Sequence, residues 1–201
     1  MKKQIIVIHG GDTFDSYEEY LKFLKDFQID FEEYRIGKIG WKKTLRERLG
    51  DDFEVIAPDM PNKINAKYSE WKIWFEKFIP HFNQGVILVG HSLGGTFLAK
   101  YLSENNFPKK ILATFLIAPA YDDEHSDYSM ADFILPESLS RFERQGGKIF
   151  IYGSEDDPVV QSIDFEKYEN KLKGAIMKKF TDRQHFNQEE LPEIIEDIKS
   201  L

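Results

Sequence analysis

Ser92 lies between two glycines, in the segment Gly90-His91-Ser92-Leu93-Gly94. This G-x-S-x-G pattern is typical of a sharp turn that joins a strand to a helix and exposes the serine hydroxyl. An apolar run over 86–89 precedes it, as a buried strand would, and apolar side chains recur at helical spacing after it. A hydroxyl held at such a turn can attack an acyl carbonyl once a base removes its proton. We therefore predict that Ser92 is a nucleophile rather than part of a turn without chemistry.

A serine nucleophile needs a histidine as base. At a strand–turn–helix site of this kind the acid and then the histidine follow the serine along the chain. Of the five histidines, only His185 follows the last predicted strand, just before the final predicted helix. His9 and His91 end predicted strands beside Ser92, and we expect them to pack against the site and shape it. The predicted base is His185.

The acid that orients the histidine is less sharply defined by the residues alone. Asp156 and Asp157 both follow the predicted strand at 148–152 and both qualify by position. Asp122 and Asp123, beyond the preceding predicted strand, are a further alternative. Chain order and chemistry do not choose between the first two.

The tetrahedral intermediate of acyl transfer carries an oxyanion, which needs two N–H donors. One donor is expected to be the backbone of Leu93, the residue after the nucleophile, at the start of the predicted helix. The other should come from the turn after the first strand, and we predict Gly11, with Asp12 as the alternative.

These residues need a sheet to bring them together, and short apolar runs that alternate with helical patterns supply one. The predicted strands are 4–8, 53–57, 85–89, 111–117, 148–152 and 175–180. Helical stripes are predicted from Trp71 to Ile79 and from Leu191 to Ile198. Such alternation predicts a three-layer α/β/α fold, in which helices cover both faces of an about six-stranded, mostly parallel sheet. Ligands of such sheets bind at the carboxyl ends of the strands, where Ser92 lies.

The interval between the first two strands is long enough to hold an insertion, at about 12–40. A capping-box pattern at Ser16 opens a predicted helix, residues 28 to 40 show no clear period, and a short helix is predicted from Trp41 to Gly50. Because the insertion follows the first strand, we expect it beside the active-site mouth. Either it walls a pocket for an apolar acyl group or it packs away from the site. Its aromatic residues are Phe14, Tyr17, Phe27, Phe31 and Tyr34.

Composition predicts a soluble, cytoplasmic globular protein: 201 residues, 41% hydrophobic, without a signal peptide or an apolar run of membrane-spanning length. The net charge of -8 argues against nucleic acid and anionic membranes as partners, and favours soluble substrates over lipid surfaces. The absence of cysteine excludes disulfides and thiolate sites. The acidic loop at 121–127, with Asp122, Asp123, Glu124, His125 and Asp127, is expected to be solvated rather than to bind a metal.

The chain resembles the α/β-hydrolase superfamily and, within it, the small serine hydrolases similar to YdeN and to retinoblastoma-binding protein nine. The resemblance rests on segments at 5–10, 57–62, 91–95, 153–158 and 184–186. It implies one domain over 1–201 without a large cap, and Asp157 as the acid, because in that family the aspartate immediately before Pro-Val has this role. Gln161 and Gln184 stand where the family often has proline and glycine.

The function expected from the residues and the resemblance together is hydrolysis of an ester, thioester or related acyl bond in a small-molecule substrate. The reaction would pass through an acyl-enzyme on Ser92 and would need no cofactor and no metal. The alternative is a catalytically silent protein that keeps the hydrolase fold as a protein-binding surface, since fold alone does not guarantee chemistry.

Overall fold

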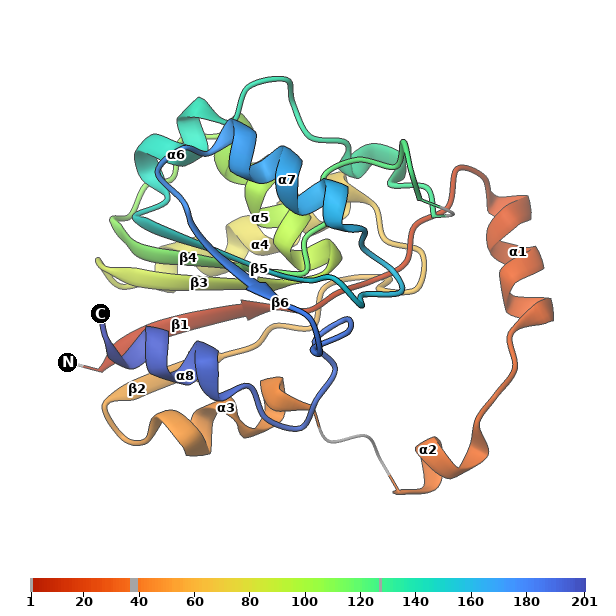
Figure 1. The fold of residues 1–201 in the computed structure, drawn as a ribbon, viewed down its shortest axis with the longest axis horizontal. Helices are drawn as coiled ribbons and strands as arrows, with labels where there is room; N and C mark the ends of the chain where they lie inside the picture. The colour runs from red at the N-terminus through yellow and green to blue at the C-terminus, as the bar shows by residue number, and fades with distance from the viewer. Residues whose placement is uncertain (1, 37–39, 127) are drawn as a thin grey trace.

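One parallel sheet forms the centre of the protein in the computed structural model, which describes residues 2–36, 40–126 and 128–201 (Figure 1). Its strands lie in the order β2-β1-β3-β4-β5-β6, and every neighbouring pair is parallel. The strands are β1 (Lys3–Ile8), β2 (Phe53–Ile56), β3 (Val86–His91), β4 (Ile111–Ile117), β5 (Lys148–Ser154) and β6 (Ile176–Phe180). The six strands predicted from apolar runs are therefore confirmed.

Helices cover both faces of the sheet, as predicted. One face carries α3 (Trp41–Leu49) and α8 (Pro192–Lys199), and the other carries α4 (Tyr68–Phe78), α5 (Leu93–Glu104), α6 (Ser140–Gln145) and α7 (Ser162–Lys171) (Figure 1). Two 3-10 turns, at Ile79–His81 and Ala131–Phe133, complete the second layer. No helix in the described parts of the chain is both long and apolar enough to cross a membrane.

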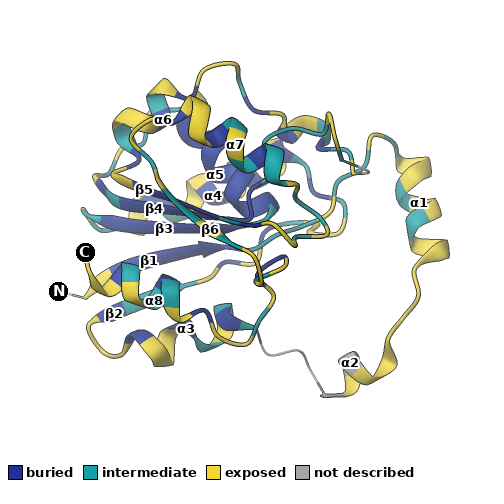
Figure 2. Ribbon diagram, viewed as in Figure 1, coloured by how far each residue is buried: buried dark blue, intermediate teal, exposed yellow. Residues whose placement is uncertain are grey.

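The core is divided by the sheet into two apolar layers, which explains why the central strands are almost continuously apolar. In β1, Ile6 and Ile8 pack on the side of α4 and α5, while Ile5 and Val7 pack on the side of α3 and α8. Figure 2 shows β1, β3, β4 and β5 as buried along most of their length. Alternate side chains bury on opposite faces, so both must be apolar.

The insertion between β1 and β2 projects from this body as two helices, α1 (Tyr17–Asp26) and α2 (Phe31–Ile36), at the right of Figure 1. The predicted cap is present, since the Ser16 Oγ accepts a hydrogen bond from the Glu19 N–H at 3.1 Å. Helix α1 has no buried residue, and Figure 2 shows it as largely exposed. The described part of the insertion, residues 12–36, is called the arm below, and it gains little stability from the core.

Helix α2 lies where the sequence showed no clear period, and it was therefore not predicted. The contacts of its described side chains are local and polar. The Asp30 carboxylate accepts the Glu32 N–H at 3.0 Å, and Arg35 pairs with Glu32 at 2.6 Å, three positions apart. Contacts of this kind leave no apolar stripe in the sequence. Residues 37–39 and the side chain of Tyr34 lie outside the described part of the chain.

Candidate active site

Ser92 lies in a strained turn between the end of β3 and the first residue of α5. Its φ is 55°, in the left-handed region that non-glycine residues seldom adopt. Two backbone hydrogen bonds hold this conformation: the Ser92 N–H donates to the Ile117 carbonyl at 2.8 Å, and its own carbonyl accepts the Gly95 N–H at 2.8 Å. The turn thus fixes Ser92 at the carboxyl edge of the sheet, as the G-x-S-x-G pattern predicted.

Gly90 and Gly94 are required because backbone segments meet at this turn without room for a side chain. A Cβ on Gly90 would lie 2.4 Å from the Gly94 carbonyl oxygen. A Cβ on Gly94 would lie 2.4 Å from the Ile8 carbonyl oxygen and 2.5 Å from that of His9. The glycines therefore let α5 begin directly against the end of β1.

A substitution of Gly94 by alanine is expected to destabilise the fold, because its Cβ meets backbone that cannot move without separating β1 from α5. Overpacking of this kind costs about 3 kcal/mol or more of the free energy of unfolding. Urea denaturation measures the effect. Gly40→Ala is the matched control, since no atom lies within 4 Å of its added Cβ. A Gly94→Ala protein as stable as the wild type would contradict the close approach.

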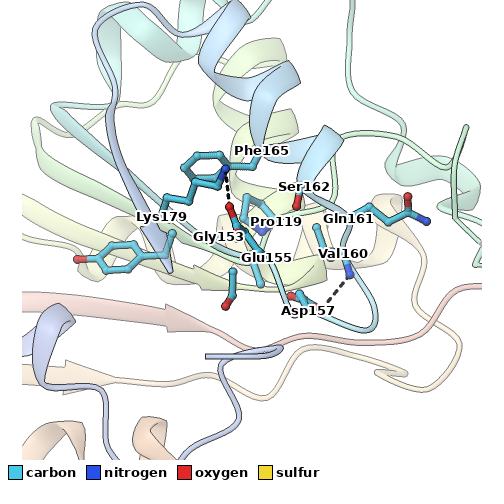
Figure 3. A pocket seen from close by; sticks show the side chains of 12 residues that line it. Pro119, Gly153, Glu155, Asp157, Val160, Gln161, Ser162, Phe165 and Lys179 are labelled. Carbon is cyan, nitrogen blue, oxygen red and sulfur yellow. Dashed lines mark hydrogen bonds and ion pairs between the residues drawn. The ribbon is translucent and has the colours of Figure 1, made fainter. Parts of the chain in front are cut away.

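The side chains of His185 and Asp157 are in contact, and they join two loops at the carboxyl edge of the sheet. His185 lies in the loop after β6, and its Nδ1 is 2.9 Å from Asp157 Oδ2 and 3.1 Å from Oδ1. The Asp157 side chain is only 2% exposed, and its Oδ1 also accepts the N–H groups of Val159 and Val160 at 2.8 and 3.0 Å. Figure 3 shows this carboxylate and Val160 in the loop after β5. Because a carboxylate accepts at Nδ1, the proton is on Nδ1 and Nε2 is left as a base.

Asp156 lies in the same loop but has different partners from Asp157. Its Oδ1 accepts the backbone N–H of Gln184 at 2.9 Å and the Ser154 hydroxyl at 2.5 Å. Asp156 therefore holds the backbone next to His185, whereas Asp157 holds the ring. The carboxylates of Asp122 and Asp123, the alternative acids, are engaged by Lys167 and by the Met130 N–H, respectively.

Gln184 adopts φ 45°, a left-handed conformation that glycine would adopt without strain. Phe186, on the other side of His185, also has a positive φ, 52°. The backbone therefore turns sharply on both sides of His185. The hydrogen bond from the Gln184 N–H to Asp156 offsets the strain that glycine would avoid.

His91 and Lys42 brace this loop from the opposite side, and of these two Lys42 was not singled out by the sequence. His91 Nε2 is 2.8 Å from the His185 carbonyl oxygen, and Lys42 Nζ is 2.9 Å from His91 Nδ1. Since a carbonyl only accepts, His91 Nε2 carries the proton and Nδ1 accepts from the ammonium. Burial, followed by the charge of Lys42, keeps the pKa of His91 well below its ordinary value. His91 is therefore a neutral bridge, which is the shaping role expected of it.

Ser92 and His185 open into one cavity of about 560 Å³, which Gly10, Gly11 and Leu93 also line. Leu93 is the first residue of α5, so its N–H lies in the turn that has no partner within the helix. The Asp12 N–H donates to the Lys63 carbonyl at 2.8 Å, so the alternative oxyanion donor is already occupied. Gly11 remains the candidate for the second oxyanion donor in the loop after β1.

The acidic loop after β4 forms no metal site in the parts of the chain that the structure describes. Lys167 pairs with Asp122 at 2.6 Å and with Glu124 at 2.9 Å, so these two carboxylates share one ammonium. Asp127, one of the acidic residues noted in the sequence, lies outside the described residues.

The base of the arm reaches the same cavity. Phe14 and Phe23 line it, with ring centroids 5.1 Å apart, and the Lys67 ammonium donates to the Phe14 carbonyl at 3.1 Å. Tyr17 and Phe31, by contrast, are 63% and 72% exposed. Part of the insertion therefore lies beside this cavity, and only some of its described aromatic side chains line it.

The model of one protein family, described as serine hydrolase, matches residues 36–196. The chain belongs to the serine hydrolase family. It is 27% identical over 165 residues to serine hydrolase RBBP9 of Rattus norvegicus, an alignment that covers 82% of this chain and 86% of the rat protein.

Solved structures show the same fold at lower sequence identity. The ydeN gene product from B. subtilis superposes with a TM-score of 0.71 at 16% identity, over 99% of this chain and 98% of that one. Esterase PE8 superposes with a TM-score of 0.61 at 14% identity, over 99% of this chain and 92% of that one. The fold is the small α/β-hydrolase fold, and the family match makes the chain a serine hydrolase.

Proposed function

We propose that this serine hydrolase cleaves an ester, thioester or related acyl bond through a triad of Ser92, His185 and Asp157. The observation that carries the proposal is the buried carboxylate of Asp157 at 2.9 Å from His185 Nδ1, on a histidine that opens into the same cavity as Ser92. A base oriented in this way, beside a hydroxyl exposed by a strained turn, is the arrangement that serine activation requires.

In the proposed reaction Ser92 Oγ attacks the acyl carbonyl while His185 Nε2 takes its proton. The N–H groups of Leu93 and Gly11 stabilise the resulting oxyanion. When the intermediate collapses, His185 returns the proton to the leaving group and the acyl chain stays on Ser92. Water then attacks the acyl-enzyme with His185 again as base, which releases the acid and restores the hydroxyl. Every step uses side chains or amides of this chain.

Labelling with a fluorophosphonate tests the proposal, because this probe phosphonylates only an activated serine. We expect one label per chain, on Ser92, located by peptide mass spectrometry and absent from Ser92→Ala. A folded wild-type protein that stays unlabelled would instead favour the alternative role, in which the hydrolase fold serves as a protein-binding surface.

We further propose that the arm walls the pocket for an apolar acyl chain, and Phe23 provides the test. Phe23→Ala should lower kcat/KM for p-nitrophenyl octanoate about tenfold and leave that for the acetate nearly unchanged, since only the longer chain can contact the ring. Tyr17→Ala is the control, because Tyr17 lies on the same helix but does not line the cavity. An unchanged chain-length preference in Phe23→Ala would show that the arm packs away from the substrate.

A further inference from the structure

Lys42 places a cation in the active-site cavity. Its side chain lines the cavity together with Ser92 and His185, although it comes from α3, at the far end of the insertion. The ammonium lies 2.9 Å from His91 Nδ1 and 5.3 Å from the centre of the Trp41 ring. These contacts fix its position beside the catalytic histidine loop.

Within the described residues no carboxylate pairs with this ammonium. His91 accepts from it as a neutral ring, and the Trp41 ring is also uncharged. An ammonium has three N–H groups, so the hydrogen bond to His91 leaves two available for a ligand. Burial lowers the pKa of Lys42 to about 8, with no carboxylate opposing the effect.

The two carboxylates that line the cavity, Asp12 and Asp122, have cations other than Lys42 near them. Asp122 pairs with Lys167 at 2.6 Å, and the charge of Lys63 acts on Asp12. The imidazoles of His9 and His91, whose pKa values burial lowers, are neutral neighbours. Lys42 is therefore a cation of this cavity that pairs with no carboxylate among the described residues, in a protein whose net charge is -8.

We propose that Lys42 is an anion-binding group of the active site and that the substrate is an ester or thioester that carries a carboxylate. The inference rests on the proposed hydrolase function, and it names the substrate class. A carboxylate at this position would replace water on the two remaining ammonium N–H groups and form a charge-assisted pair in a half-buried environment. Long-range repulsion from the acidic surface makes such a local cation more important for an anionic substrate.

The test compares matched esters with and without a carboxylate. On the acyl side, the mono-p-nitrophenyl ester of glutarate is compared with p-nitrophenyl butyrate. On the leaving-group side, 4-carboxyphenyl butyrate is compared with its methyl ester. We expect the wild type to prefer the carboxylate in one of the two pairs, and the pair that shows the preference identifies the side on which Lys42 acts.

Lys42→Gln is the informative variant, because glutamine can still donate to His91 Nδ1 but carries no charge. We expect the ratio of kcat/KM for the anionic ester to that for its neutral partner to fall about tenfold or more. Lys110→Gln, which removes an exposed lysine beside the amino end of β4, is the control and should leave the ratio unchanged. In the wild type the ratio should also decline as the pH rises through about 8, where Lys42 loses its proton.

Equal loss on anionic and neutral esters in Lys42→Gln would overturn the proposal, because it would mean that Lys42 acts only by bracing His91. A wild type labelled by fluorophosphonate but indifferent to the carboxylate would also overturn it and leave the hydrolase function intact. If none of these esters is turned over, protection of Ser92 from labelling by monomethyl glutarate, compared with methyl butyrate, gives the same comparison. If the folded wild-type protein is not labelled by fluorophosphonate at all, the proposed hydrolase mechanism itself is contradicted.

Discussion

Replacement of Ser92 by alanine is expected to lower kcat for any ester substrate by several orders of magnitude, about 10⁶ in the protease precedent for a missing nucleophile. The acyl-enzyme cannot form without the Oγ atom, so burst-phase release of p-nitrophenol should disappear as well. His185→Ala should be nearly as harmful, and the double variant little worse, because the two residues act as a unit. Steady-state and burst kinetics measure these effects.

The fold should survive the Ser92→Ala change, so a thermal unfolding curve near that of the wild type separates lost chemistry from lost structure. Ser126→Ala is the matched control, since that serine lines the same cavity but does not lie at the turn between β3 and α5. It should keep near-normal kcat. Unchanged turnover in Ser92→Ala would end the proposed mechanism.

Asp157→Asn should lower kcat by about 10⁴, the loss known for the equivalent change in a serine protease. The asparagine oxygen can keep the hydrogen bonds from Val159 and Val160, which turns its NH₂ group toward His185 Nδ1. The ring must then accept at Nδ1 and carry its proton on Nε2. In that tautomer it cannot take the proton of Ser92.

Two neighbouring carboxylates serve as controls for the acid. Asp156→Asn keeps an oxygen that can accept the Gln184 N–H, so kcat should stay within about tenfold of the wild type. Asp123→Asn should have no effect on the chemistry, because Met130 and not His185 is its partner. The acid assignment would be wrong if Asp123→Asn lost activity while Asp157→Asn kept it.

The elements that position this site were predictable where burial leaves a pattern in the sequence. The central strands are apolar on both faces, and Ser92 follows one of them between glycines that the close approach of backbone requires. Helix α2 was not predictable in this way, because Glu32 and Arg35 stabilise it through local polar contacts. Apolar periodicity reports on the core, and the described side chains of this helix, Phe31, Glu32 and Arg35, are all exposed.

The residues around His185 show a second limit. Asp156 and Asp157 are adjacent carboxylates that both contact the His185 loop, one at its backbone and one at its ring. In the sequence, only the resemblance to a family distinguished Asp157 from Asp156 as the predicted acid. The structure then showed that the two carboxylates have different partners. Lys42 carried no local signal, because its contact with His91 spans 49 positions of the chain and depends on how α3 lies against β3.

The hydrogen bonds between α3 and the His185 loop have a consequence for biosynthesis. The Trp41 indole N–H donates to the Phe186 carbonyl at 2.9 Å, across 145 positions of the chain, and the Trp41 backbone N–H donates to Gln188 at 3.0 Å. A chain growing on the ribosome contains Ser92 and α3 long before the loop with Phe186 and Gln188, which packs against α3, has been made. The nascent protein therefore lacks the hydrogen bonds from Trp41 to this loop until residues 186–188 have emerged, and the proposed site cannot form before that point of synthesis.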